Sequence, residues 1–195
     1  MMRNTSKQSS NLLKLIILAL LGTISLLLFF LNFPLPFLPP YLKIDFSDVP
    51  ALMASLIFSP LAGIIVVAVK NLLYLAVSGA GDPIGVAANF LAGVMFVVPV
   101  SILYHKYKGV KSIVSGLVTG TLIMAIGMSV LNYFIILPAY GWFMGWEMTN
   151  QVIWASVLAG VLPFNIIKGI IVALLFVPLF IKMHSWITQQ QTKFI

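Results

Sequence analysis

Apolar residues fill most of this 195-residue chain, in runs separated by short polar or proline-rich segments. The first run, 12–31, has about the ~20 residues that a helix needs to cross the hydrocarbon core of a bilayer. Another run, 49–58, is too short to span alone. The pattern predicts an all-α protein of six membrane helices, over residues 12–31, 49–58, 61–77, 83–103, 112–137 and 151–181.

Composition agrees with a single transmembrane domain over residues 1–195. Hydrophobic residues make up 61% of the chain and charged residues only 8%, against about 25% charged in an average soluble domain. No polar stretch is long enough for a large soluble domain. The run 12–31 is too long for a typical signal-peptide core and has no small-residue cleavage site before Asn32, so we expect a membrane helix there. Without cysteine, disulfides and thiolate metal sites are excluded.

Charged residues predict the topology. Most Lys and Arg residues gather in three groups: residues 3–14, 106–111 and 182–193. The acids lie in other segments: Asp45, Asp48, Asp82 and Glu147. Short loops rich in Lys and Arg stay in the cytoplasm. We therefore expect cytoplasmic N- and C-termini, with the acids on the outer side, in a multi-pass protein of the plasma membrane.

A polar pair interrupts the last apolar run, inside Pro163–Gly169. Asn165 and Lys168 are three residues apart and share one helix face. A lysine at mid-membrane depth costs roughly 2.5–3.5 kcal/mol on insertion scales, so this face should look into the bundle or a wet cavity. The pair predicts a polar ligand site. The alternatives are a structural clamp between helices and a lysine that reaches the interface.

Four other segments have distinctive patterns. The segment 32–48 combines four closely spaced prolines with aromatic residues, which suits either a lid over a pocket or an interfacial connector. Lys70 and Asn71 must face the interior, as a second polar site or in packing. The run 112–137 is rich in Gly, Ser and Thr, so we expect it to be buried among other helices. The aromatic segment 138–150 should be an outer interfacial loop.

The residues favour recognition over catalysis. The chain has no Walker-type phosphate loop, no HExxH motif and no histidine at mid-membrane depth. We expect no enzyme, no catalytic cofactor, no metal and no nucleic acid. The outer half of the bundle can gather the following polar residues: Asp82, Asn89, Asn132, Glu147, Asn165 and Lys168. Amides with one cation suit a flat, partly apolar ligand that carries carbonyls and ring nitrogens.

Three ordered segments together resemble the riboflavin-binding S components of energy-coupling factor (ECF) vitamin transporters. They are PPYLKIDFSDVP at 39–50, NYFIILP at 132–138 and PFNIIKG at 163–169. The resemblance covers nearly the whole chain. It implies a six-helix subunit that captures riboflavin from outside with high affinity. It also implies partners: a membrane coupling subunit (the T component) and two ABC-type ATPases.

The resemblance further implies which residues bind. Polar groups of the last helices would contact the flavin ring, namely Asn132, Asn165 and Lys168. The loop after the first helix and the turn before the fourth would cover the ligand, which points to Tyr41, Leu42, Lys43, Ala80, Gly81 and Asp82. A small-residue motif on the first helix would dock the coupling subunit, and its nearest match is Ala19, Gly22 and Thr23.

Two other functions stay open at this point. One is a small intramembrane enzyme that acts on a lipid or prenyl substrate, with Lys168 or Glu147 as the catalytic group. The other is a standalone channel or scaffold, which would need no buried lysine.

Overall fold

A computed structural model describes residues 2–78, 81–145 and 147–194 of the chain. The elements, in order, are α1 (Met2–Phe30), β1 (Phe33–Pro34), β2 (Lys43–Ile44), α2 (Asp48–Ile57), α3 (Pro60–Val77), α4 (Pro83–Tyr107), α5 (Gly109–Leu131), η1 (Asn132–Ile136), α6 (Leu137–Met144), α7 (Asn150–Ser156), η2 (Val157–Val161) and α8 (Leu162–Phe194). The elements η1 and η2 are single π-helical turns.

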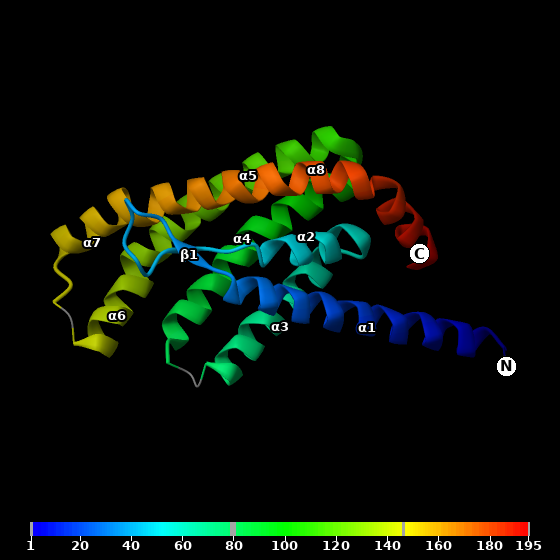
Figure 1. Cartoon of the computed structure of the whole chain (residues 1–195), viewed down its shortest axis with the longest axis horizontal. Helices are drawn as coiled ribbons and strands as arrows, with labels where there is room; N and C mark the ends of the chain where they lie inside the picture. The colour runs from blue at the N-terminus through cyan, green and yellow to red at the C-terminus, as the bar shows by residue number, and fades with distance from the viewer. Residues whose placement is uncertain (1, 79–80, 146, 195) are drawn as a thin grey trace.

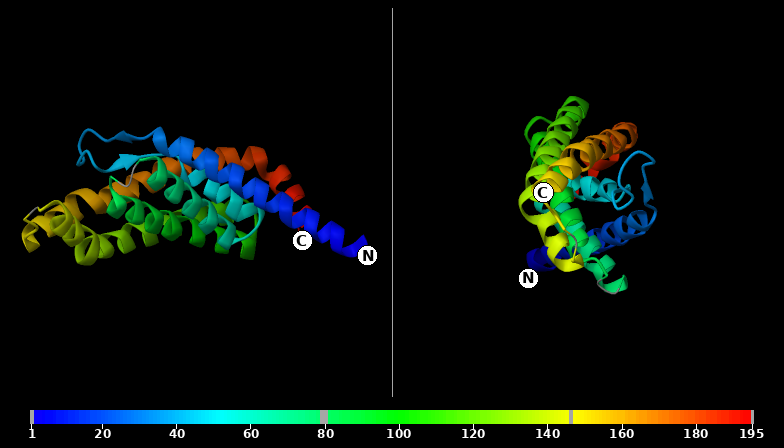
Figure 2. Two further views of the ribbon diagram at one scale, coloured as in Figure 1. Left: turned by 90° about the horizontal axis from the view of Figure 1, so that it is seen from below. Right: turned by 90° about the vertical axis from the view of Figure 1, so that its left-hand side faces the viewer.

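These elements make six helical rods, which confirms the expected number. The segments α5–η1–α6 and α7–η2–α8 are each continuous. Five rods are long and apolar enough to cross a membrane, and α2 is a shorter apolar helix. Both termini lie at one end of the bundle, and the segment that leads into α2 and the first turns of α4 and α7 lie toward the other end (Figures 1 and 2).

One helix end differs from the sequence prediction at a proline. The helix predicted to end at Leu137 continues through Pro138 to Met144, so most of the expected loop 138–150 is helical. Proline normally breaks a helix, since it lacks an N–H and clashes with a preceding carbonyl. Here the wider π-turn η1 precedes Pro138, and the Leu137 N–H reaches back five residues to the Asn132 carbonyl. The same arrangement, with η2, precedes Pro163.

The helix α2 is the centre of the bundle, with all ten of its residues buried. Its C-terminal end lies inside the protein. The last carbonyl groups of a helix have no donor within the helix, so here they need hydrogen-bond donors from other segments. Ser101 Oγ (3.0 Å) and His105 Nε2 (2.9 Å) contact the Ser55 carbonyl. Gln191 Nε2 donates to the Leu56 carbonyl. This last contact helps to explain why α8 extends to Phe194 rather than ending near Ile181.

The segment between α1 and α2 is a flap. Its two short strands pair antiparallel, with Phe33 opposite Ile44. The flap rests on η2, because a Cβ added to Gly160 would lie 3.5 Å from Pro39 and 3.6 Å from Leu42. We call residues 31–47 the flap below.

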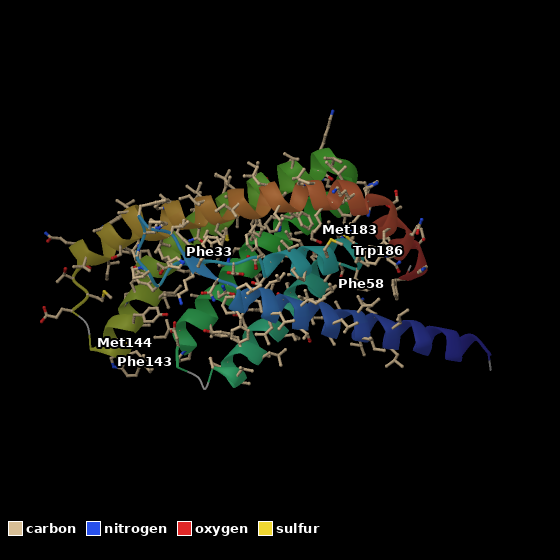
Figure 3. All side chains as sticks on the ribbon, viewed as in Figure 1. Phe33, Phe58, Phe143, Met144, Met183 and Trp186 are labelled. Carbon is tan, nitrogen blue, oxygen red and sulfur yellow. The ribbon has the colours of Figure 1, made fainter. Side chains whose placement is uncertain are left out.

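Close helix crossings depend on glycine. A Cβ on Gly120 would lie 2.6 Å from the Phe96 carbonyl, so α5 meets α4 backbone to backbone. The opposite side of α5 is not buried, contrary to expectation, since Leu122 is 53% and Ile126 61% exposed. Large apolar side chains also project outward along the other long helices (Figure 3), as a lipid-facing surface requires.

Candidate ligand-binding cavity

A cavity of about 340 Å³ lies between the flap, α4, η1 and the start of α8. This volume is within the range of about 300–1,000 Å³ that is usual for small-molecule sites. The cavity brings together most of the residues that the sequence predicts for a site. Its wall includes Tyr41, Leu42, Lys43, Asp82, Asn89, Asn132, Asn165 and Lys168.

Two predicted residues are absent from the described part of this wall, and a third is not described. Gly81 and Glu147 are not among the described residues that line the cavity. Ala80 lies outside the described residues, so its predicted contact with ligand stays a prediction.

Asn132 and Asn165 present similar groups from two neighbouring helices. Each side-chain Nδ2 donates 2.8 Å to the carbonyl four residues earlier, Met128 for Asn132 and Val161 for Asn165. Among the described residues, neither Oδ1 receives a hydrogen bond, so each is available as an acceptor. Asn132 is the first residue of the π-turn η1, and Asn165 donates to the carbonyl of Val161, the last residue of the π-turn η2. Single π-turns frequently occur at functional sites.

Lys168 is held by two carboxylates. Its Nζ lies 3.1 Å from Asp45 Oδ2 and 3.3 Å from Asp48 Oδ2. Asp45 comes from the flap and Asp48 from the first turn of α2. The lysine therefore ties α8 to both segments while it also lines the cavity. These contacts are those of the helix clamp that the sequence suggested, and the ligand-site interpretation of Lys168 stays a prediction.

A second lysine completes the cluster. Lys70 Nζ on α3 lies 3.6 Å from Asp48 Oδ1 and donates 2.8 Å to Ser47 Oγ. Ser47 in turn donates to Asp45 Oδ1 through its backbone N–H, at 2.9 Å, and through its hydroxyl. We call Asp45, Asp48, Lys70 and Lys168 the ion-pair cluster. All four side chains are buried.

The pKa of Asp45, which the flap contributes to the ion-pair cluster, depends on the charges around it. Burial alone would raise the pKa of Asp45, but the charges of Lys168 and Lys70 outweigh burial and hold that pKa below its ordinary value. Asp45 is thus a carboxylate at neutral pH, as the ion pair requires.

The cluster is what sequence reasoning missed. Asp45 and Asp48 look like outer-loop acids in the sequence, yet each is only 1% exposed. A signal existed, because a buried lysine needs a counter-ion. Lys70 and Lys168 are two such lysines within apolar runs, and the acids at 45 and 48 sit where a loop enters a helix.

The outer wall of the cavity has its own contact. Asp82 Oδ1 accepts from the Gly85 N–H (2.8 Å) at the start of α4, and both its carboxylate oxygens accept from the Tyr140 hydroxyl of α6, at 2.7 and 2.8 Å. This contact joins α4 and α6 beside the cavity. Nearby, Asn89 Oδ1 is buried without a hydrogen-bond partner among the described residues. Tyr140, Phe29 and Tyr74 also line the cavity and were not predicted.

The predicted docking motif on α1 divides between two environments. Gly22 is buried within the chain, because a Cβ there would lie 2.7 Å from Val69 Cγ1 of α3. Ala19 and Thr23 are exposed on the outer face of α1.

Comparison with known proteins gives consistent matches over most of the chain. The family model of the ECF transporter substrate-specific component matches residues 13–180. The chain is 48% identical to the riboflavin transporter FmnP of Bacillus subtilis (strain 168), over 93% of this chain and 97% of that protein. It is 43% identical to the riboflavin transporter RibU of Staphylococcus aureus (strain TCH60), over 89% and 92% of the two chains.

A solved structure of the S component of a bacterial ECF transporter is similar to this fold. Its TM-score is 0.75 at 44% sequence identity, and the match covers 89% of this chain and 96% of that one.

Proposed function

Because this chain belongs to the family of substrate-specific components of ECF transporters, we propose that it is the riboflavin-binding subunit of such a transporter. It is a multi-pass membrane protein that serves transport rather than catalysis. The observation that carries the proposal is the joining of Asn132, Asn165 and Lys168 in one wall of a cavity of suitable size.

The chemistry of the wall suits a flavin ring. Such a ring is flat and partly apolar, and carries carbonyl oxygens, ring nitrogens and an N–H. The amide oxygens of Asn132 and Asn165 can accept from an N–H. Lys168 can donate to a carbonyl or ring nitrogen. Aromatic side chains such as Tyr74 offer apolar surface around the ring.

We assign further ligand contacts to the cavity's cover and mouth. The flap contributes Tyr41, Leu42 and Lys43, and Asp82 can accept from hydroxyl groups of a sugar-alcohol chain. Ala80 and Gly81, in the turn before α4, would act on the cover rather than on the wall.

The ligand enters from the extracellular side in this proposal. The flap, which supplies Tyr41, Leu42 and Lys43 to the cavity wall, lies toward the end of the bundle opposite the two termini (Figure 1). The basic groups at 3–14, 106–111 and 182–193 favour a cytoplasmic position for the termini.

We assign uptake to a complex. The sequence has no phosphate loop of its own. Energy would come from two ABC-type ATPases, coupled through a membrane T component. The exposed side of α1 at Ala19 and Thr23 is the proposed docking face for that subunit.

The proposal is tested by titrating purified, ligand-free protein with riboflavin and following the quenching of the protein's fluorescence. We expect one-to-one quenching at nanomolar concentrations, with no effect from biotin as a control vitamin. A lack of quenching at tens of micromolar riboflavin would overturn the proposed function.

A further inference from the structure

Lys168 is the member of the ion-pair cluster that reaches the cavity, and its three partners lie behind it. Asp45, Asp48 and Lys70 are not among the described residues that line the cavity. Each of the three is at most 1% exposed. These partners can therefore influence a ligand through Lys168, through the net charge of the cluster, and, for Lys70, through the ring of Phe29, which lies 5.0 Å from the Lys70 Nζ and lines the cavity.

The contacts of Lys168 leave at least one donor for the ligand. An ammonium group carries three N–H donors. Asp45 Oδ2, at 3.1 Å, accepts a hydrogen bond from one of them, and Asp48 Oδ2 lies at ion-pair distance from the same ammonium, at 3.3 Å, without hydrogen-bond geometry. The direction of the remaining N–H groups depends on these two contacts. A change in the attraction of either carboxylate for the Lys168 ammonium would therefore change the N–H donor that Lys168 presents to the cavity.

Lys70 balances the charge of this arrangement. It contacts Asp48 through Oδ1, whereas Lys168 contacts the same carboxylate through Oδ2. Two lysines thus face two carboxylates, and the cluster carries no net charge. Without the Lys70 charge the cluster would be net negative. Inside a protein, where charges are poorly screened, an uncompensated charge acts strongly on its neighbours.

We propose that Lys70 is a positioning residue for ligand recognition: by neutralising Asp48, it keeps one N–H of Lys168 available to an acceptor atom of the ligand. This inference rests on the proposed function. When Lys70 is absent, the excess negative charge draws Lys168 toward its carboxylates and repels the electron-rich carbonyl and ring-nitrogen atoms of a flavin. The ligand class that the cluster favours is neutral and rich in acceptors.

The test compares riboflavin dissociation constants among four proteins: wild type, Lys70→Met, Lys70→Arg and the double variant Lys70→Met/Asp48→Asn. Lys70→Met removes the charge and should weaken binding by about tenfold or more, since buried charge pairs of this kind couple strongly. Lys70→Arg keeps the charge and should bind more tightly than Lys70→Met. The double variant restores neutrality and should recover to within about threefold of wild type.

Each outcome has a distinct meaning. If wild type itself fails to bind riboflavin, the proposed function is overturned. If wild type binds and Lys70→Met binds equally well, only the role of Lys70 is overturned. A double variant no better than Lys70→Met would also overturn it, because a lysine that serves packing alone is not rescued by removing its counter-ion.

A second comparison covers the case in which Lys70→Met does not fold. Asp48→Asn alone leaves the cluster net positive, and adding Lys70→Met returns it to neutral. The proposal predicts that this addition does not weaken riboflavin binding. Further weakening on addition would show that Lys70 is purely structural.

Discussion

At the scale of single residues, a comparison of two buried asparagines can distinguish ligand contact from helix packing. Asn165 and Asn71 are both buried, and each donates 2.8 Å to the carbonyl four residues earlier. Only Asn165 lines the cavity. Asn165→Ala should weaken riboflavin binding by about 0.5–1.5 kcal/mol, the net value of one hydrogen bond. Isothermal titration of both alanine variants measures this, and equal losses for Asn71→Ala would contradict direct contact by Asn165.

Lys168 combines two roles, so its replacement should have two effects. Lys168→Met removes a charge-assisted hydrogen bond to the ligand, which costs about 1.5–3 kcal/mol of binding. It also leaves two buried carboxylates with one lysine, and breaking a buried pair costs about 3–5 kcal/mol of stability. We expect both a higher dissociation constant and a lower midpoint of thermal denaturation.

The control for Lys168 is Lys43, an exposed lysine of the same cavity wall. Lys43→Met should leave the denaturation midpoint unchanged. If Lys168→Met also left it unchanged, the ion-pair cluster would not contribute to stability.

Asp45 predicts how the protein responds to acid. Its pKa is lower in the folded protein than the ordinary value of 3.8, so its carboxylate stabilises the fold above that pH. This contribution is lost as the pH falls below 3.8 and through the lower folded value. Denaturation midpoints measured from neutral to acidic pH should fall more steeply for wild type than for Asp45→Asn. If the midpoints of the two proteins fell equally with pH, the stabilising role of the Asp45 carboxylate would be contradicted.

At the scale of elements, the sequence indicates helices well and their irregularities poorly. Apolar length predicts all six rods, and charge predicts that Lys168 faces inward. The π-turns were not predictable, because Pro138 in the sequence indicates an end rather than a wider turn. The need of Lys168 for a counter-ion was predictable, but its partner was not, since Asp45 and Lys168 are separated by 123 positions and meet only in the folded chain.

The crossing of α5 and α8 gives a prediction about packing. A Cβ added to Gly169 would lie 2.2 Å from Thr121 Oγ1, well inside normal contact. Gly169→Ala should destabilise the fold by about 1–3 kcal/mol, as overpacking does. Gly81→Ala is the matched control, because among the described residues its added Cβ meets only the Ser78 carbonyl, at 3.8 Å. Equal denaturation midpoints for the two variants would show that the α5–α8 crossing can rearrange to accommodate the added methyl group.

At the scale of the whole molecule, the proposed ligand site and the proposed docking face lie on different surfaces. The cavity lies inside the bundle, and Thr23 lies on the outer face of α1. Thr23→Trp should leave riboflavin binding unchanged but abolish riboflavin uptake by cells, since the bulky ring would block docking of the T component. Leu122→Trp, on the exposed face of α5, should leave both unchanged. Normal uptake by Thr23→Trp cells would place the docking face elsewhere.

The neutrality of the ion-pair cluster has an electrical consequence. Moving one elementary charge through a membrane potential of 100 mV involves about 2.3 kcal/mol of work. Two lysines and two carboxylates that move together transfer no net charge, and neither does a neutral vitamin. The free energy of moving the cluster and its ligand along the membrane normal therefore does not depend on the membrane potential. This movement should be possible in a cell whose membrane potential has collapsed.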